Sequence, residues 1–237
     1  MNEPLKAVTR RPTLAADVVE RLKEYIAVNK LQAGDRLPSQ DQLAKSLGVS
    51  RAVVREAVKS LETTGILRSQ HGGGVFVSDF DPKSLADGLA FGLDQLSAPQ
   101  RLNYLYEARE LYEVGAMKFV VERITEEETH EMRSLIAQME KAGEESLKLD
   151  YAFHKALLRA SHNPIVTRFG DVLHELFILL RGSAVVPTPE DHERVLGRHK
   201  QLLESVLSRD VGRAQAAMAD HIATSKARWL ASVKEEA

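Results

Sequence analysis

The chain of 237 residues contains no cysteine, one tryptophan and only 5% aromatic residues. Without cysteine it can form no disulfide, thiolate zinc site, iron–sulfur cluster or cysteine nucleophile. No apolar run approaches the roughly 18 residues that indicate a membrane span, and the first residues lack the apolar stretch of a secretory signal. We therefore expect a cytoplasmic protein without a membrane partner, whose polar chemistry depends on oxygen and nitrogen side chains.

Net charge is also small, because 32 Lys and Arg residues stand against 34 Asp and Glu residues, for a formal charge of −2. The charge is unevenly distributed. Residues 1–78 hold 12 basic and 8 acidic side chains, a net of +4, whereas the remainder holds 20 and 26, a net of −6. A change of sign between segments is typical of a nucleic-acid-binding module joined to another domain, although neutral domains can also carry so modest an excess.

The first 78 residues have the pattern of three helices followed by a β-hairpin. Apolar residues recur every three or four positions in residues 13–29, which predicts an amphipathic helix. Ser39 and Ser50 are expected to N-cap two further helices, and Gly48 separates these helices. The segment ILRSQHGGGVFVSD alternates apolar and polar residues around a glycine turn, which indicates a hairpin.

The remainder of the chain is expected to be helical nearly throughout. Residues 79–84 are interpreted as a linker, because Pro82 disfavours helix at Asp81. Helices are then expected at about 83–96, 99–122, 125–142, 145–160, 163–182, 190–208 and 210–232. The sequence thus predicts a mainly α protein with two domains, residues 1–78 and residues 85–237, the second an all-α helical bundle.

The segment LAKSLGVSRAVVREAV has the layout of a helix-turn-helix with Gly48 at the turn. The first residues of its second helix would then meet base edges in the major groove. Arg51, Arg55 and Lys59 recur every four residues and form one basic stripe, and arginine binds guanine or phosphate through paired hydrogen bonds. The alternative is a solvated face whose arginines pair with nearby glutamates. The turn, the cap and the glycine-rich hairpin together favour DNA binding.

The hairpin tip, HGGG, fits the wing of a winged helix-turn-helix. Its glycines would let the backbone approach a phosphate or a groove wall, and His71 could enter the minor groove. The residues expected to contact DNA are Arg36, Ser50, Arg51, Arg55, Lys59, His71, Gly72 and Gly73. Helix-turn-helix geometry predicts a homodimer on a near-palindromic, double-stranded operator.

Histidines are the informative residues of the second domain. Asp150 and His154 lie one helical turn apart, and His199 and His221 each lie on the apolar face of their own helix. If the four side chains converge, three imidazoles and one carboxylate suit a divalent ion such as Zn²⁺, Ni²⁺, Co²⁺ or Mn²⁺. The alternatives are hydrogen-bonded core histidines and, for Asp150 and His154, a simple ion pair. Structural roles are expected for three other histidines, and exposure for a fourth: His162, His174 and His192, and His130.

Residues 11–78 resemble the DNA-binding domain of the GntR family of bacterial transcription regulators. The matching residues, in order, are Gly34, Leu37, Pro38, Ser39, Leu43, Ala44, Gly48, Val49, Ser50, Arg51, Val54, Arg55, Glu56, Ala57, Leu61, Gly65, Gly72 and Val77. In that family the arginines of the VSR and VRE segments, here Arg51 and Arg55, touch the operator, and the wing glycines meet the minor groove. Relatives carry PSER or PSEREL where this chain has PSQDQL, so Asp41 replaces an arginine that often touches DNA.

The segments LDYAFHKALLRASHNP and GRHKQLLESVLSRDVGRAQAAMADHI resemble the helical FCD ligand domain of the FadR subfamily within GntR. The resemblance implies that the metal ligands of its metal-binding members correspond to Asp150, His154, His199 and His221. The stretch EARELYEVGA resembles the one whose arginine faces the effector cavity, which implies Arg109 as an effector-binding residue. The alternative for Arg109 is a surface ion pair with Glu113, and Arg181 is a second candidate for the effector.

These features predict a transcriptional repressor rather than an enzyme. Its helical domain would bind a divalent metal and an effector. The effector would be a small organic acid whose carboxylate is bound and which modulates operator binding. One alternative is a metal-dependent hydrolase, since a histidine-rich site can activate water, although no separate general base is recognisable. The other is a metal-free regulator that senses an acyl-CoA-type ligand, and the presence of all four ligand positions argues against it.

Overall fold

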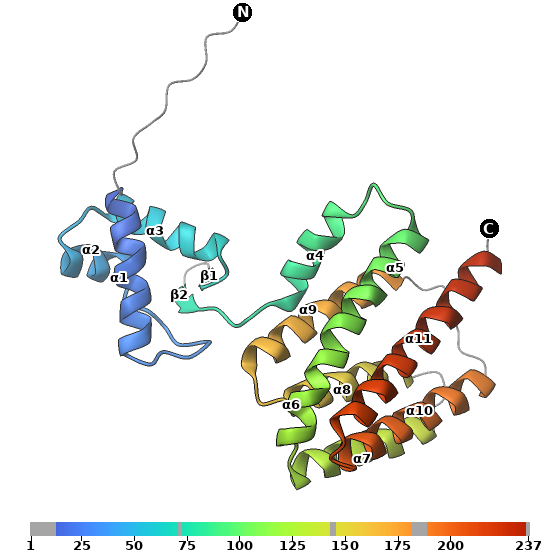
Figure 1. Ribbon diagram of the computed structural model, residues 1–237. Coiled ribbons are helices and arrows are strands. Elements are labelled where there is room, and N and C mark those ends of the chain that lie inside the picture. The colour runs from blue at the N-terminus through green and yellow to red at the C-terminus, as the bar shows by residue number, and fades with distance from the viewer. Residues whose placement is uncertain (1–12, 71–72, 143–145, 182–188, 236–237) are drawn as a thin grey trace, which may run out of the picture. The chain divides into compact units, whose positions relative to one another are not determined.

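The computed structural model describes residues 13–70, 73–142, 146–181 and 189–235, and the chain divides between Asp81 and Pro82 into two compact units (Figure 1). The described residues are mainly helical, with one two-stranded antiparallel sheet, which confirms the predicted fold class. None of the helices within these ranges is both long and apolar enough to cross a membrane.

The first unit contains three helices and a hairpin. They are α1 (Leu14–Val28), α2 (Gln40–Leu47), α3 (Arg51–Thr63), β1 (Leu67–Gln70) and β2 (Gly74–Val77). Ser39 begins α2 as predicted, since its hydroxyl accepts from Gln42 N while Gln42 Oε1 accepts from Ser39 N. Gly48 ends α2 with φ of +66°, a left-handed conformation that glycine adopts without a Cβ penalty, and Ser50 then caps α3. The turn between the two helices is therefore only three residues long.

The predicted hairpin is present: β1 pairs with β2 in antiparallel orientation, with Leu67 opposite Val77 and Gln70 opposite Gly74. The segment 34–37 extends this sheet on its other side. Val77 N donates to Asp35 O at 2.9 Å, and Leu37 N donates to Val75 O at 2.9 Å. The sequence predicts only a break between helices here. Gly34 and Pro38 indicate the end of a helix, but they do not indicate that the residues between them pair with a strand.

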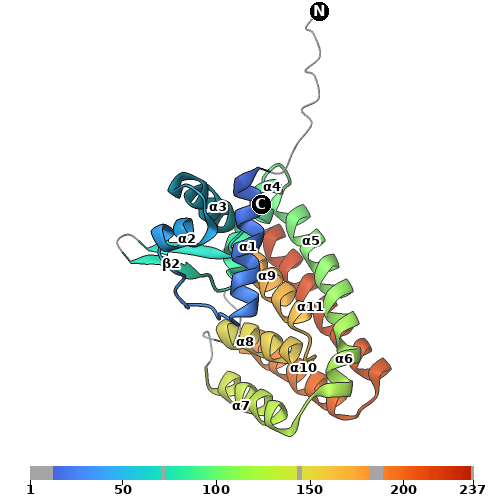
Figure 2. The same cartoon turned by 90° about the vertical axis from the view of Figure 1, so that its left-hand side faces the viewer.

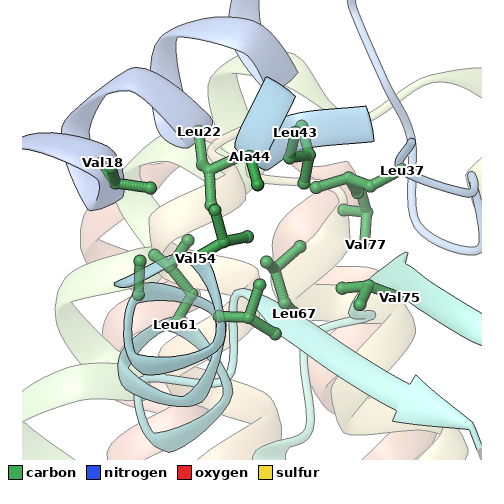
Figure 3. Packing of buried hydrophobic residues seen from close by; sticks show 12 residues of the cluster. Val18, Leu22, Leu37, Leu43, Ala44, Val54, Leu61, Leu67, Val75 and Val77 are labelled. Carbon is green, nitrogen blue, oxygen red and sulfur yellow. The ribbon is translucent and has the colours of Figure 1, made fainter. Parts of the chain in front are cut away.

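Apolar side chains from all these elements form one core (Figure 3). Leu22 of α1, Val54 and Leu61 of α3, and Leu67 of β1 are each at most 2% exposed. In the close-up they point toward one another between the helices and the sheet. The core therefore fixes α3 against the hairpin, while the opposite face of α3 remains in solvent.

The second unit is a helical bundle (Figures 1 and 2). Its elements are α4 (Pro82–Gly92), α5 (Ala98–Arg109), the π-helical turn η1 (Glu110–Val114), α6 (Gly115–Arg123), α7 (Glu126–Ala142), α8 (Ser146–Arg159), α9 (Pro164–Arg181), α10 (Pro189–Leu207) and α11 (Val211–Glu235). Helix α4 packs against α9, α7 against α8, and α10 against α11, while α11 also contacts α5, η1 and α6.

Two details differ from the sequence predictions. Helix α4 begins at Pro82, inside the expected linker, because proline lacks only an N–H that the first helical turn leaves unbonded anyway. The helix expected at 99–122 is interrupted by η1, where the hydrogen-bonded turn widens from four residues to five. Tyr112 of η1 donates its hydroxyl to the carbonyl of Val166, which ties this turn to the beginning of α9.

Candidate metal centre and nucleic-acid interface

Four side chains singled out in the sequence come together inside the second unit. Asp150 and His154 come from α8, His199 from α10 and His221 from α11. One ligand atom from each lies within 4.8 Å of the others. The three histidines are at most 6% exposed, and about a quarter of the Asp150 side chain remains accessible. Three helices therefore contribute donors to one point in the bundle.

Hydrogen bonds on the outer side of two of these imidazoles determine which nitrogen carries the proton. His199 Nδ1 lies 2.9 Å from the carbonyl of Val195, which can only accept, so His199 donates from Nδ1. In the same way, His154 Nδ1 donates to Glu113 Oε2 at 2.8 Å. In the neutral form of each ring, the Nε2 lone pair would consequently be directed inward, which is the orientation a metal ligand requires.

The inner side of the His199 ring faces a carboxylate that repels a bare lone pair, and the inner side of the His154 ring faces another imidazole nitrogen. His199 Nε2 is 2.9 Å from Asp150 Oδ1, and His154 Nε2 is 3.0 Å from His221 Nε2. A lone pair opposite a carboxylate oxygen is favourable only when a proton or a cation holds the two together. Two donors that lie about 2.1 Å from one ion, at right angles, are themselves about 3.0 Å apart. The donor set therefore fits a single divalent ion.

The pKa shifts of Asp150 and His221 also suit a bound cation. Burial opposes ionisation of Asp150, but a proton on His199 Nε2, which would donate to the carboxylate, and positive charge on the neighbouring imidazoles outweigh burial and place the pKa of Asp150 well below its usual value. A cation held between neutral rings would lower this pKa in the same direction. Burial lowers the pKa of His221 well below the ordinary histidine value, which favours the neutral ring that a metal needs.

A second group of buried polar residues lies directly behind His154. Arg109, at the end of α5, donates from Nε to Glu113 Oε1 at 2.6 Å, and Glu113 in η1 also accepts from His154. Arg109 is 4% exposed and Glu113 is fully buried, so the expected surface pair exists but lies in the interior. Burial opposes ionisation of Glu113, but Arg109 and His154 outweigh it and hold the pKa of Glu113 well below its usual value. Removing one partner of such a pair costs roughly 3–5 kcal/mol, because the other charge stays buried.

The sequence did not assign a role to Glu113 or a polar environment to His174. Glu113 forms a carboxylate–histidine contact that orients a ligand, and its only signal was its spacing of four residues from Arg109. His174 of α9 was expected to be a hydrogen-bonded core residue. It is buried, at 3% exposed, but neither of its ring nitrogens has a hydrogen-bond partner among the described residues.

The remaining histidines and the second effector candidate lie away from this centre. His130 is exposed, and His162 is exposed with its Nε2 3.0 Å from Glu128 Oε1. His192 is half-buried near the beginning of α10. Arg181 is the last residue of α9, and its side chain lies outside the described residues.

The expected DNA-reading face of the first unit is exposed. Arg51, Arg55 and Lys59 of α3 are all solvent-accessible, whereas Val54 and Val58 on the opposite side are buried. Among the described residues neither Arg55 nor Lys59 forms an ion pair, so the pairing with nearby glutamates that was the alternative for Arg55 does not occur there.

Arg36 packs against Gly74, the first residue of β2 after the hairpin turn. Gly74 has φ of +111°, and a Cβ built on it would lie 2.9 Å from Arg36 Nε. Glycine is therefore favoured at position 74 by its conformation, and a Cβ there would also force the Arg36 side chain to move. Ser50 is used as the cap of α3, and Gly73 lies in the hairpin turn. His71 and Gly72, also expected to contact DNA, lie outside the described residues.

Comparison with known proteins finds a family match for each of the two units. The family model described as bacterial regulatory proteins, gntR family, matches residues 14–77, and the model of the FCD domain matches residues 104–224. The HTH-type transcriptional regulator YcbG of Bacillus subtilis, labelled uncharacterized, is 30% identical over 99% of this chain and 98% of its own length. The chain belongs to the GntR family of bacterial regulators.

Two further comparisons agree with this assignment to the GntR family. The HTH-type transcriptional regulator LutR of Bacillus subtilis is 28% identical over 81% of this chain and 90% of its own length. The solved structure of Streptococcus agalactiae GntR has the same fold, with a TM-score of 0.73 and 24% identity over 90% of this chain and 99% of that one. The relatives are transcriptional regulators, not enzymes, and the GntR domain implies that this chain binds operator DNA.

Within the GntR domain, Asp41 takes part in a contact that the sequence did not predict. Its carboxylate, in the first turn of α2, forms an ion pair with Nε of Arg51 at the beginning of α3. Both side chains are more than half exposed, so the pair contributes only about 1 kcal/mol or less to stability. Its effect falls instead on the orientation and the charge of Arg51, an exposed arginine that is expected to contact DNA.

We expect Asp41→Asn to strengthen binding to random DNA and to weaken discrimination at the base pair that Arg51 reads. The first effect follows from loss of a negative charge near phosphates, and the second from loss of the contact that orients Arg51. Fluorescence anisotropy with an operator selected by the wild-type protein, its single-base variants and random DNA measures both effects. Glu56→Gln is the matched control, because it removes the same charge from exposed α3 without touching Arg51. Equal discrimination by Asp41→Asn and Glu56→Gln would show that Asp41 acts through charge alone.

Proposed function

We propose that the protein is a metal-dependent transcriptional repressor that binds a near-palindromic operator as a homodimer and responds to a small carboxylate. The observation that carries this proposal is the convergence of Asp150, His154, His199 and His221 on one point of the FCD domain. The orientation of the imidazole lone pairs supports a divalent ion, Zn²⁺, Ni²⁺, Co²⁺ or Mn²⁺, as the species bound there.

The ion would supply a Lewis-acidic, positively charged anchor for an effector oxygen. The protein's own residues set up that anchor. Glu113 holds the His154 ring in one tautomer, and Arg109 holds Glu113. Arg109 also carries the buried positive charge best placed for an organic acid, because its Nη groups have no hydrogen-bond partner among the described residues.

DNA recognition in this proposal uses the exposed face of α3. Arg51, Arg55 and Lys59 contact the major groove, Ser50 contributes at the beginning of the helix, and the hairpin approaches the minor groove. The side chain of Arg36 lies beside Gly74 at the start of β2, and Gly73 lies in the turn of that hairpin. Occupation of an operator by such a dimer represses by excluding polymerase, and an effector alters it only by binding two conformations unequally.

The metal centre is tested by His199→Ala combined with His221→Ala. Loss of two imidazole donors should reduce bound metal from the wild-type level to background in elemental analysis of the purified protein. His130→Ala, which removes an exposed histidine from α7, is the control and should retain metal. Metal at the wild-type level in the double variant would place the metal elsewhere in the chain.

The DNA interface is tested by Arg55→Ala. Removing a guanidinium that neutralises a phosphate or reads a base should weaken operator binding about tenfold and, for a phosphate contact, reduce the salt slope by about one. Titrations of operator DNA at several salt concentrations measure both quantities. Arg133→Ala removes the same charge from exposed α7 and should change neither. An operator affinity that does not change would exclude Arg55 from the interface.

A further inference from the structure

The side chain of Arg36 lies over the hairpin of the first unit and is directed toward its turn. The backbone of Arg36 pairs with Phe76 in an isolated antiparallel bridge. Its guanidinium lies instead beside Gly74, two residues nearer the turn, where a Cβ would be 2.9 Å from Nε and 3.1 Å from Nη2 of Arg36. Diagonal neighbours of this kind share one face of a sheet. Because position 74 has no side chain, Arg36 can occupy the space above it.

This arginine lies on the outer face of the sheet and is available to a partner. Val75 and Val77, which alternate with Gly74 and Phe76 along β2, are buried in the core, so Arg36 lies on the opposite face. The residue is exposed, and its side chain forms no ion pair or hydrogen bond with any other residue that the structure describes. Its positive charge is therefore not neutralised within that part of the chain.

The hairpin itself brings little positive charge to its turn. Residues 69–77 contain neither lysine nor arginine. Arg68 in β1 stacks on Phe76, with its guanidinium carbon 5.1 Å from the ring centre. Since Phe76 is two residues beyond Gly74, this stacking places Arg68 roughly 7 Å farther from the turn. Of the two arginines on this sheet face, Arg36 is the one beside the turn.

We propose that Arg36 recognises a narrow minor groove, and that the operator therefore contains a short run of A·T base pairs where the hairpin approaches DNA. The inference rests on the proposed function, in which the hairpin meets the minor groove. That function requires only that Arg36 contact DNA, whereas the inference states which base pairs this residue selects.

A narrow minor groove attracts arginine for electrostatic reasons. Runs of A·T pairs narrow the groove, which strengthens the negative potential between the two phosphate backbones. A G·C pair widens the groove and also places the guanine N2 amino group in it, where the amino group opposes a cation. A guanidinium suits this position better than an ammonium group, because it is more weakly hydrated and loses its water at lower cost.

The first measurement is a selection of binding sites from random double-stranded DNA by the full-length wild-type protein and by Arg36→Gln. We expect the wild-type sites to contain a run of A·T pairs at a fixed distance from each segment that α3 selects. The Arg36→Gln sites should keep the segments selected by α3 and lose the A·T run. Wild-type sites that have no such run would overturn the inference.

The second measurement distinguishes recognition of the minor groove from recognition of bases in the major groove. The A·T run of the selected operator is replaced by G·C pairs or by inosine·cytosine pairs, which lack the N2 amino group but otherwise resemble G·C in the major groove. Fluorescence anisotropy should show about fivefold weaker binding of the wild-type protein to the G·C operator. The inosine·cytosine operator should bind nearly as tightly as the original. Equal weakening by both replacements would place the recognition in the major groove and overturn the inference.

Three variants assign the preference to Arg36. Arg36→Gln should bind the original, G·C and inosine·cytosine operators with nearly equal affinity. Arg36→Lys keeps the charge, so it should retain the salt dependence of the wild-type protein but lose most of the preference. Arg68→Gln is the matched control, because it removes the same charge from the same sheet face farther from the turn, and it should retain the preference. A preference as large in Arg36→Gln as in the wild-type protein would remove Arg36 from groove recognition.

The outcomes separate this inference from the proposed function. Selected sites that contain the α3 segments without an A·T run would reject the inference and leave the DNA-binding regulator in place. A wild-type protein that enriches no sequence would reject the proposed function and the inference together. The comparison of the three operators uses the wild-type protein alone, so it decides the inference even if a variant does not fold.

Discussion

The geometry of the helical unit depends on the contact between Glu113 and His154. Both nitrogens of that imidazole are engaged, Nδ1 by Glu113 and Nε2 toward His221, so the ring has a single usable orientation and tautomer. The Glu113 carboxylate is itself held by the hydrogen bond from Arg109, and the backbone of Glu113 lies in the widened turn of η1. Because each of these groups is buried, loss of one leaves a neighbour charged or unpaired in a medium that penalises both.

The sequence could predict the four candidate metal ligands because each follows a local rule. Asp150 and His154 are spaced by one helical turn, and His199 and His221 share the apolar periodicity of their helices, so their inward direction is visible without coordinates. Which histidines meet is a tertiary property. It was expected from the family resemblance and follows in the structure from the packing of α8, α10 and α11.

Glu113 and His174 could not be placed in the same way. The spacing of Arg109 and Glu113 is identical for a surface pair and a buried one, and only tertiary packing, such as that of α11 against η1, distinguishes them. The five-residue turn of η1 has no signature in the residues ELYEV. His174 lies on the buried face of α9, and its lack of hydrogen-bond partners depends on the side chains brought near it from α5, η1 and α8.

In the first unit, by contrast, Ser39, Gly48 and Ser50 marked the helix ends directly, since caps act within one turn.

The ion pair between Asp41 and Arg51 has a consequence for the time the regulator spends on incorrect sites. The first 78 residues carry a net charge of only +4, and this pair offsets one of the positive charges next to the reading helix. Residence on random DNA depends on that charge, whereas residence at an operator also depends on base contacts. With the Asp41 carboxylate beside Arg51, the domain would therefore dissociate from random DNA sooner than a domain without it, and it would sample more sites in a given time. Weak general attraction thus favours a rapid search, and in the proposed interface the base contacts of α3 would decide where the search ends.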